Sequence, residues 1–269
     1  MHAQWQSQNS NTNEHLTSIQ FLNSDVGYII GENGVFLKTL NGGEDWIQLE
    51  IPFSGGDIAN PPSLHFINEQ IGMIEVDYKG IAKTIDGGNS WTIMEIGADF
   101  GAMNIRLMNE NEGILVNDNK IFRTNNLGAT WQAIDMANLS DEFFSSDEVE
   151  FLNDKVGWIV TNSIMLKTID GGLSWELDFD YWTHADLSTV GALLHRIEAI
   201  SDDTLFVGSR YYIGFFSSFN AGINFEYTPM LVKDIAFLDA KAGFAIDDQN
   251  SIEFIKKTMD GGVTWTSIY

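Results

Sequence analysis

The sequence predicts an all-β fold: a six-bladed β-propeller of four-stranded blades, with a seven-bladed propeller as the alternative. Three observations support this prediction. A short turn motif recurs six times, and a strand-like phrase precedes each copy. In addition, the chain of 269 residues contains only four prolines and no long helical pattern outside residues 186–195. Repeats at a constant spacing of this size are typical of propellers.

The turn motif is best preserved in three copies that read Lys-Thr-x-Asp-Gly-Gly-x-Ser/Thr-Trp, and three looser copies replace Asp by Asn. The six copies span Lys38–Trp46, Lys83–Trp91, Arg123–Trp131, Lys167–Trp175, Ser217–Phe225 and Lys257–Trp265. The aromatic residues that end them are 45, 40, 44, 50 and 40 residues apart. This spacing matches one propeller blade of roughly 40–50 residues.

The chemistry of the motif explains its residue types. An Asp or Asn side chain at a turn accepts hydrogen bonds from backbone amides further along the chain. The glycine two residues later tolerates a positive φ, which a residue with a Cβ resists. The terminal aromatic residue is large enough to fill the gap between adjoining sheets. We therefore interpret these Asp turns as structural and exclude their residues from any functional site.

The phrase upstream of each turn alternates apolar and polar residues, which is typical of a strand. Its six copies are residues 18–23, 63–68, 104–109, 148–153, 196–201 and 234–239. A short apolar strand follows, as at Gly27–Ile30, and a third strand leads into the Asp turn, as at Val35–Lys38. A fourth strand begins at the aromatic residue. Each repeat therefore predicts strands A, B, C and D of one blade.

The charge of the chain limits its partners. Lys and Arg number 14 and Asp and Glu 38, which gives a formal net charge of −24. Such a surface repels phosphate groups, so nucleic-acid binding is not expected. No apolar run approaches the roughly 20 residues of a membrane span, and no membrane insertion is predicted. The absence of cysteine excludes thiolate chemistry and Cys-based metal sites. No cofactor is indicated.

These motifs resemble those of Asp-box (bacterial neuraminidase repeat) propellers. The combined phrase of strand A, Gly-aromatic and Asp turn is most similar to the photosystem II stability/assembly factor-like family, over roughly residues 17–269. The resemblance implies a non-catalytic assembly chaperone, and the family has seven blades where six repeats are counted here. Its photosynthetic members carry an arginine-rich patch, whereas this chain has four arginines, at positions 106, 123, 196 and 210. We therefore expect a bacterial relative outside photosynthesis.

Residues 1–269 are predicted to form a single propeller domain, to which the N-terminal segment also belongs. Trp5 lies 41 residues before Trp46, in phase with the repeat. We interpret Ala3–Gln8 as an outer strand that joins the last blade as a clasp, followed by an Asn-rich linker, within residues 1–16. A closed propeller leaves no sheet edge to pair, so a monomer is expected.

The loops opposite the Asp turns form the predicted binding surface, the loop face. Three D-to-A connections are longer than a turn requires: Ile51–Pro62, Ala137–Asp147 and Asp178–His195. Long loops on a rigid scaffold commonly carry binding function. Aromatic side chains there suit a glycan or a protein anchor, although they could equally pack beneath their own loops. The candidates are Tyr78, Phe143, Phe144, Tyr181, Trp182, His184, Tyr211 and Tyr212.

A second candidate site lies on strand A of each repeat, at the position before the apolar residue that is most often Phe. Five of the six residues there are polar, which predicts that they face a central channel. They could hold a small polar ligand or satisfy one another. The channel candidates are His65, Arg106, Glu150 and Glu198, and Gln20 and Ala236 occupy the remaining two positions.

Acidic pairs offer a possible calcium site. They are Asp178 with Asp180, Asp202 with Asp203, and Asp247 with Asp248. None has the spacing of a defined calcium loop. A solvated acidic surface is therefore favoured and no metal site is predicted.

The main functional hypothesis is a non-catalytic module that binds a protein or glycan through the loop face. The alternative is a sialidase-like glycoside hydrolase. That chemistry would draw on Arg106, Arg196 and Arg210, on Tyr211 or Tyr212, and on Glu150 or Glu198. No catalytic residue is assigned, because acid pairs are easy to nominate among 38 carboxylates. An acidic chain without cysteine suits the periplasm, the cell surface or the secreted space of a bacterium.

Overall fold

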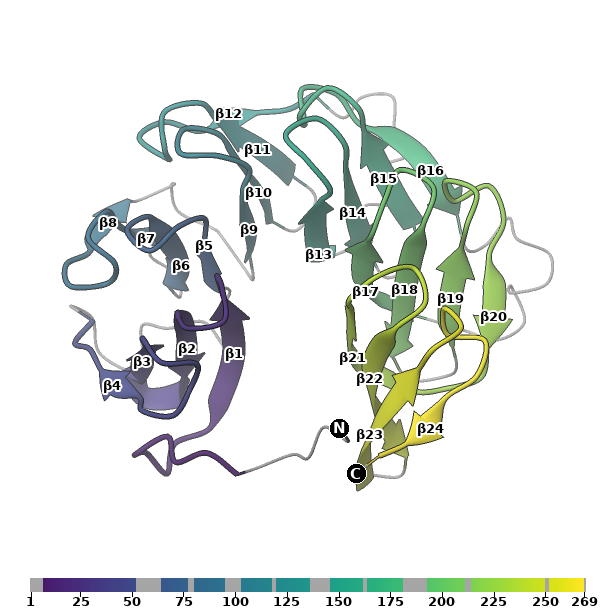
Figure 1. Ribbon diagram of the computed structural model, residues 1–269. Helices are drawn as coiled ribbons and strands as arrows, with labels where there is room; N and C mark the ends of the chain where they lie inside the picture. The colour runs from purple at the N-terminus through teal and green to yellow at the C-terminus, as the bar shows by residue number, and fades with distance from the viewer. Residues whose placement is uncertain are drawn as a thin grey trace. The chain divides into compact units, whose positions relative to one another are not determined.

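The computed structural model describes residues 7–51, 64–76, 80–94, 103–117, 120–135, 146–161, 164–180, 193–210, 214–249 and 252–268. These residues form six four-stranded antiparallel sheets, the blades of a six-bladed β-propeller (Figure 1). The prediction of an all-β, six-bladed fold is confirmed. The helical content of the described residues is one 3-10 turn, Glu32–Gly34, and no helix is long and apolar enough to cross a membrane.

The chain divides into two compact units, described separately below. Unit 1 comprises residues 1–117 and 124–132, and unit 2 comprises residues 118–123 and 133–269. The first two sheets lie in unit 1. The first contains β1 (Leu16–Phe21), β2 (Gly27–Gly31), β3 (Phe36–Thr39) and β4 (Ile47–Gln48). The second contains β5 (Leu64–Phe66), β6 (Gly72–Val76), β7 (Gly80–Thr84) and β8 (Thr92–Met94). The third contains β9 (Met103–Leu107), β10 (Gly113–Asn117), β11 (Lys120–Thr124) and β12 (Gln132–Ala133).

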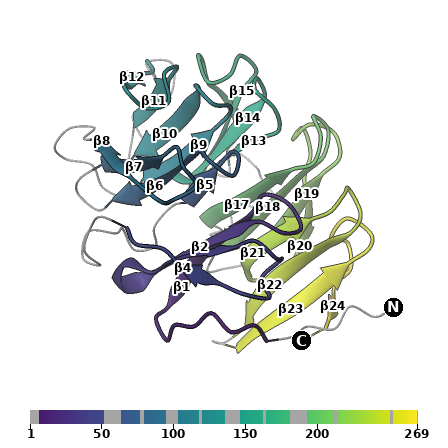
Figure 2. The ribbon, with the colours of Figure 1, turned by 60° about the vertical axis from the view of Figure 1, so that its left-hand side comes forward.

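The fourth, fifth and sixth sheets lie in unit 2. Figure 2 shows the fifth and sixth sheets as neighbours. The fourth contains β13 (Ser146–Phe151), β14 (Gly157–Thr161), β15 (Ile164–Thr168) and β16 (Glu176–Asp180). The fifth contains β17 (Leu193–Ala199), β18 (Leu205–Arg210), β19 (Phe215–Ser218) and β20 (Glu226–Thr228). The sixth contains β21 (Val232–Phe237), β22 (Gly243–Gln249), β23 (Ile252–Thr258) and β24 (Thr266–Ser267).

The Asp turns join the third and fourth strands of each sheet and have the predicted chemistry. In the second sheet, Thr84 Oγ1 donates to Asp86 Oδ1 at 2.9 Å and accepts from the Gly88 N–H at 2.9 Å. Asp86 accepts from both the N–H and the hydroxyl of Ser90. The side-chain hydrogen bond from Ser90 is the main reason why the pKa of Asp86 lies below its usual value. The same hydroxyl-to-Asp/Asn bond recurs at Thr39, Thr124, Thr168, Ser218 and Thr258.

The terminal aromatic residues of the turns lie between neighbouring sheets, as predicted. Trp91 meets Phe36 of the preceding sheet edge-on, with ring centroids 5.4 Å apart, and Phe66 of its own sheet at 6.2 Å. In unit 2, Trp265 meets Phe215 of the preceding sheet in the same way, at 5.1 Å. Edge-to-face pairs of this kind stabilise beyond the area they bury. Trp91 and Trp265 therefore hold their sheets against the ones before them.

Two Asp turns carry a side chain where the others carry glycine. Ala221 has φ +63° and Leu127 has φ +51°, whereas the equivalent Gly261 has φ +73°. An L-residue in this left-handed region costs about 1 kcal/mol or more. We expect Ala221→Gly to raise the free energy of unfolding by about 1 kcal/mol. Urea denaturation of both proteins measures the difference. The fifth turn is not strained if the variant proves less stable.

The N-terminal prediction lies partly outside the described residues. Residues 1–6 are not described, so the clasp formed by Ala3–Gln8 stays a prediction. Residues 7–15 contain no strand, and Asn11 Nδ2 donates to the carbonyl oxygen of Trp46 at 3.4 Å.

Two predicted loop boundaries were wrong. The connection Ala137–Asp147 ends earlier than expected, because β13 begins at Ser146. The connection Asp178–His195 is shorter than expected, because β16 extends to Asp180 and β17 begins at Leu193. Residues 193–195, at the end of the helical pattern, lie in that strand.

Candidate functional site

The two predicted binding surfaces differ in how much of them the structure describes. All eight loop-face candidates lie outside the described residues, so this surface stays a prediction. The four channel candidates all lie on first strands: His65 on β5, Arg106 on β9, Glu150 on β13 and Glu198 on β17. In the described structure these strands contact the first strand of the next sheet within each unit. The candidate site is therefore built from the polar side chains of the first strands.

In unit 1, the polar residues of the first strands bind the backbone of the next strand. The amide of Gln20 donates to the Phe66 carbonyl oxygen at 2.8 Å and accepts from the Phe66 N–H at 2.7 Å. His65 repeats this one sheet further on, because its Nδ1 accepts from the Leu107 N–H at 3.1 Å. Burial, with the nearby Arg106 charge, holds the pKa of His65 well below its usual value. His65 is therefore neutral at pH 7, with its proton on Nε2.

The double hydrogen bond of Gln20 gives a direct test of this role. In Gln20→Ala, both backbone groups of Phe66 lose their side-chain partner. We expect the free energy of unfolding to fall by about 2 kcal/mol. Gln20→Glu is the matched control, because its carboxylate can still accept from the Phe66 N–H. Chemical denaturation should place that variant between the wild type and Gln20→Ala, and equal stability of all three would contradict the role.

In unit 2, two glutamates replace Gln and His in the same role. Glu148 Oε2 accepts from the Ile197 N–H at 2.6 Å, and Glu198 Oε2 accepts from the Phe237 N–H at 2.7 Å. Burial raises the pKa of Glu148 to about 8 and that of Glu198 to about 7. Glu150 and Asp234 raise both values further, whereas Arg196 lowers that of Glu148. The first strands of unit 2 therefore hold carboxyl groups that titrate near neutral pH.

Arg196 neutralises part of this acidic group and orders a buried histidine. Its Nε donates to Asp234 Oδ1 at 3.0 Å, and its Nη1 lies 3.1 Å from His195 Nδ1. The Nε2 of His195 lies 2.9 Å from the carbonyl oxygen of Lys233. Because a guanidinium only donates and a carbonyl only accepts, the proton of His195 must be on Nε2. His195 and Glu148 were not among the predicted site residues, although both lie on first strands, three residues before Glu198 and two before Glu150.

The basic residue that opens the turn motif has a role that was not predicted. In three sheets it donates to a backbone carbonyl of the next Asp turn: Lys38 Nζ to Gly87 at 3.2 Å, Lys83 Nζ to Leu127 at 3.1 Å, and Arg123 Nε to Gly171 at 2.9 Å. Its recurrence within the motif was the signal for this role. The basic side chains therefore connect successive sheets.

Two of the acidic residues considered for calcium have partners within the protein. Asp178 accepts from the indole N–H of Trp158 at 3.0 Å, and burial raises its pKa. Asp247 is fully buried and lies 2.5 Å from Lys256 Nζ. In the part of the chain that the structure describes, no group of three or more His, Asp or Glu side chains could hold a metal ion.

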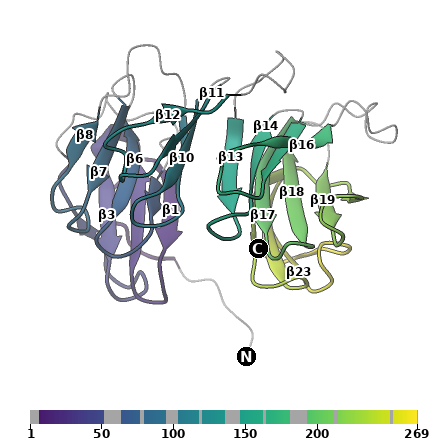
Figure 3. The same ribbon diagram turned by 90° about the horizontal axis from the view of Figure 1, so that it is seen from above.

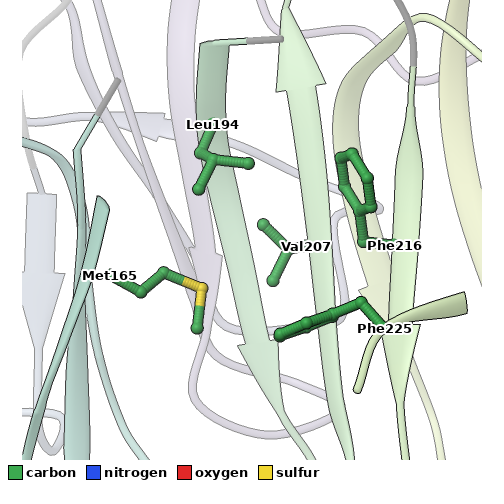
Figure 4. A pocket seen from close by; sticks show the side chains of 5 residues that line it. All are labelled: Met165, Leu194, Val207, Phe216 and Phe225. Carbon is green, nitrogen blue, oxygen red and sulfur yellow. The ribbon is translucent and has the colours of Figure 1, made fainter. Parts of the chain in front are cut away.

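An apolar pocket too small to hold a water molecule lies in unit 2 (Figure 4). Its lining residues are Met165, Leu194, Val207, Phe216 and Phe225. The first four are buried core residues from four strands, with no polar group among them. Phe225 is the terminal aromatic residue of the fifth Asp turn, where the other five turns have Trp. We attribute the pocket to this smaller ring rather than to ligand binding.

Filling the pocket should stabilise the protein. We expect Phe225→Trp to raise the free energy of unfolding by at most about 0.5 kcal/mol, because the indole covers the small apolar surface left open by the phenyl ring. Phe225→Leu should have the opposite effect. Thermal unfolding followed by calorimetry compares the three proteins, and a destabilised Trp variant would show that the site is already fully packed.

Comparison with known proteins places this geometry in a family. A family model described as photosynthesis system II assembly factor YCF48 matches residues 1–134 and 87–180. The chain belongs to this family. Membership in the YCF48 family confirms the resemblance found in the sequence. No curated protein of known function matches the sequence.

Solved structures share the fold at low sequence identity. A structure titled YCF48 bound to D1 peptide has 19% identity and a TM-score of 0.71, and the match covers 95% of this chain and 81% of the other. YCF48 from Cyanidioschyzon merolae has 18% identity and a TM-score of 0.69, with 95% and 85% covered. The GH74 xyloglucanase from Xanthomonas campestris has 10% identity and a TM-score of 0.72, with 99% and 47% covered. At these identities the likeness shows the fold alone.

Proposed function

We propose that the protein is a non-catalytic binding and assembly module whose partner is another protein. Membership in the YCF48 family carries this proposal. A structural relative is titled as bound to a D1 peptide, which is an example of protein recognition on this fold. The polar side chains Gln20, His65, Glu148 and Glu198 of the first strands are engaged in backbone hydrogen bonds, which is a structural use.

The surface that we propose for recognition is the loop face, with Tyr78, Tyr181 and Trp182 as its leading anchors. Aromatic residues dominate the binding energy of many protein interfaces. The same residue types stack on sugar rings, so a glycan is the second ligand class for this surface.

Photo-crosslinking tests the loop face directly. A benzoylphenylalanine placed at position 181 or 182 should cross-link one partner protein in cells that express the chain. The same probe at Ile47, an exposed residue of β4, is the matched control and should not. Equal cross-linking from all three positions would count against the loop face, and loss of cross-linking in the presence of an oligosaccharide would favour a glycan.

The glycoside hydrolase hypothesis has a separate test. GH74 enzymes share the fold, and Arg106 is one of the three arginines, with Arg196 and Arg210, on which sialidase-like chemistry would draw. A screen on fluorogenic sialosides and aryl glycosides should show no turnover. Turnover that is abolished by Arg106→Ala would overturn the non-catalytic proposal.

We also propose that the protein functions as a monomer outside the cytoplasm, in the periplasm, on the cell surface or in the secreted space. The compartment rests on the acidic, cysteine-free composition, and the monomer rests on a closed propeller that leaves no sheet edge to pair. Cell fractionation tests the compartment and sedimentation tests the oligomeric state.

A further inference from the structure

The Asp turns of unit 2 expose large apolar side chains to solvent. Two positions of each of these turns are apolar. The first is the residue before the Asp or Asn. The second is the residue that follows the glycine shared by all six turns, which is Gly172, Gly222 or Gly262 in unit 2. The exposed fractions run from 45% for Phe219 to 73% for Ile223. We call this set the turn surface, and it consists of Ile169, Leu173, Phe219, Ile223, Met259 and Val263.

The structure of the turn does not require an apolar residue at the second of these positions. In the fourth sheet, the side chains that hold the turn together are those of Thr168, Asp170 and Ser174. In unit 1, the position after the second glycine is Glu44, Asn89 or Ala129, and those turns make the same hydrogen bonds. Since the fold accepts polar residues there, Leu173, Ile223 and Val263 of unit 2 need another explanation, whereas the position before the Asp or Asn is apolar in unit 1 too, at Leu40 and Ile85. Exposed apolar groups gathered on one surface commonly mark an interaction site.

Each Asp turn of unit 2 lies at the end of its sheet that also holds the turn between the first and second strands (Figure 3). Each Asp turn is hydrogen-bonded to the turn between the first and second strands of its own sheet, through Gly171 to Lys155, Ala221 to Asp203, and Gly261 to Lys241. The fifth and sixth turns also touch, because the ring of Phe219 lies against Gly261. Leu238, in the first turn of the sixth sheet, adds a side chain that is 77% exposed.

The polar residues among these turns are mostly acidic. Six aspartates stand against two lysines: Asp154, Asp170, Asp202, Asp203, Asp239 and Asp260 against Lys155 and Lys241. A side-chain hydrogen bond from Thr264 lowers the pKa of Asp260, and a backbone hydrogen bond from Ala242 lowers that of Asp239. The carboxylates of Asp239 and Asp260 therefore stay ionised at neutral pH.

We propose that the turn surface docks a protein segment that combines apolar side chains with lysine or arginine. The apolar side chains of the segment would cover the exposed residues, and its cations would pair with the surrounding aspartates. A second copy of this chain fits poorly, since it would bring its own net charge of −24 against the same aspartates. This surface lies at the opposite strand ends from the loop face, so it is a site beyond the one proposed above.

Synthetic peptides test this chemistry. A labelled leucine–lysine peptide should bind the wild-type protein in a fluorescence anisotropy titration, whereas a leucine–glutamate peptide and a serine–lysine peptide of the same length should bind more weakly. The triple variant Ile169→Ser, Ile223→Ser, Val263→Ser should weaken the leucine–lysine peptide at least about tenfold, equivalent to about 1.4 kcal/mol. The matched control is Leu40→Ser with Ile85→Ser, which removes similarly exposed side chains from turns of unit 1. It should change the affinity less than about twofold.

Several results would overturn the proposal. Absence of binding between the wild type and the leucine–lysine peptide would do so. Equally tight binding of the serine–lysine peptide would also do so, because the attraction would then be purely electrostatic. An equal loss in the control variant would show that binding is not confined to unit 2. Sedimentation that shows a dimer dissociated by the triple variant would assign the surface to a second copy. Circular dichroism of each variant checks its fold. Because the loop-face cross-links involve other residues, the two proposals can fail separately.

Discussion

Replacing Gly262 by alanine is expected to lower the free energy of unfolding by about 3 kcal/mol or more. Gly262 has φ +87°, a conformation that costs an L-residue about 1–2 kcal/mol. A Cβ at this position would also overlap the ring of Phe215 in the preceding sheet. That ring is fully buried and stacks on Phe237, so it has no free space to move into. Urea denaturation measures the loss.

The equivalent glycine of the fifth turn separates the two contributions. Gly222 has a similar φ of +82°, but the nearest atom to an added Cβ is Asp178 Oδ2 at 3.2 Å. We therefore expect Gly222→Ala to cost only the backbone strain of about 1–2 kcal/mol. Equal losses in the two variants would show that the contact with Phe215 contributes nothing.

The second large effect is a fall in stability as the pH rises. Burial raises the pKa of Glu148 to about 8 in the folded protein, against 4.5 for an unperturbed glutamate. Between these values the folded state binds more protons than the unfolded state, so the free energy of unfolding decreases with pH. The contribution of the raised Glu148 pKa to the free energy of unfolding is fully present below about pH 4.5 and is lost as the pH approaches about 8. We expect Glu148 to account for about 2–4 kcal/mol of this loss, after allowing for solvent screening at a half-buried side chain.

The variant Glu148→Gln isolates this residue. Its amide stays neutral and its oxygen can still accept from the Ile197 N–H. Denaturation from about pH 5 to about pH 8.5 should give a flatter profile for the variant and a higher stability than the wild type at the alkaline end. Glu44→Gln, at an exposed turn position, is the control and should leave the profile unchanged. Parallel profiles for wild type and Glu148→Gln would refute the assignment.

The fold could be predicted because its determinants are local and repeated. The hydroxyl, Asp/Asn and glycine positions form one turn by contacts within five residues, as at Thr84, Asp86 and Gly88. The spacing of the aromatic residues then gives the number of strands between turns. Even the position of the indoles between sheets followed from this pattern, as Trp91 and Trp265 show.

The candidate site was less predictable, because its contacts connect residues that lie far apart in the sequence. Glu148 meets the backbone of Ile197, and Gln20 meets that of Phe66. A polar residue on an apolar strand reads the same whether it binds a ligand or a neighbouring backbone. The sequence could therefore indicate that the strand A positions are special without saying what they bind.

The basic residues that connect successive sheets have a consequence for how such chains change during evolution. Lys38, Lys83 and Arg123 each donate to a main-chain oxygen, which every residue type supplies. The acceptor residue of the neighbouring repeat can therefore change without a matching substitution of the basic residue. The three acceptor positions illustrate this, because they are Gly87, Leu127 and Gly171. Gain or loss of a whole repeat likewise leaves each remaining cation with an equivalent acceptor. Relatives with different numbers of repeats could arise in this way without redesigning the junctions.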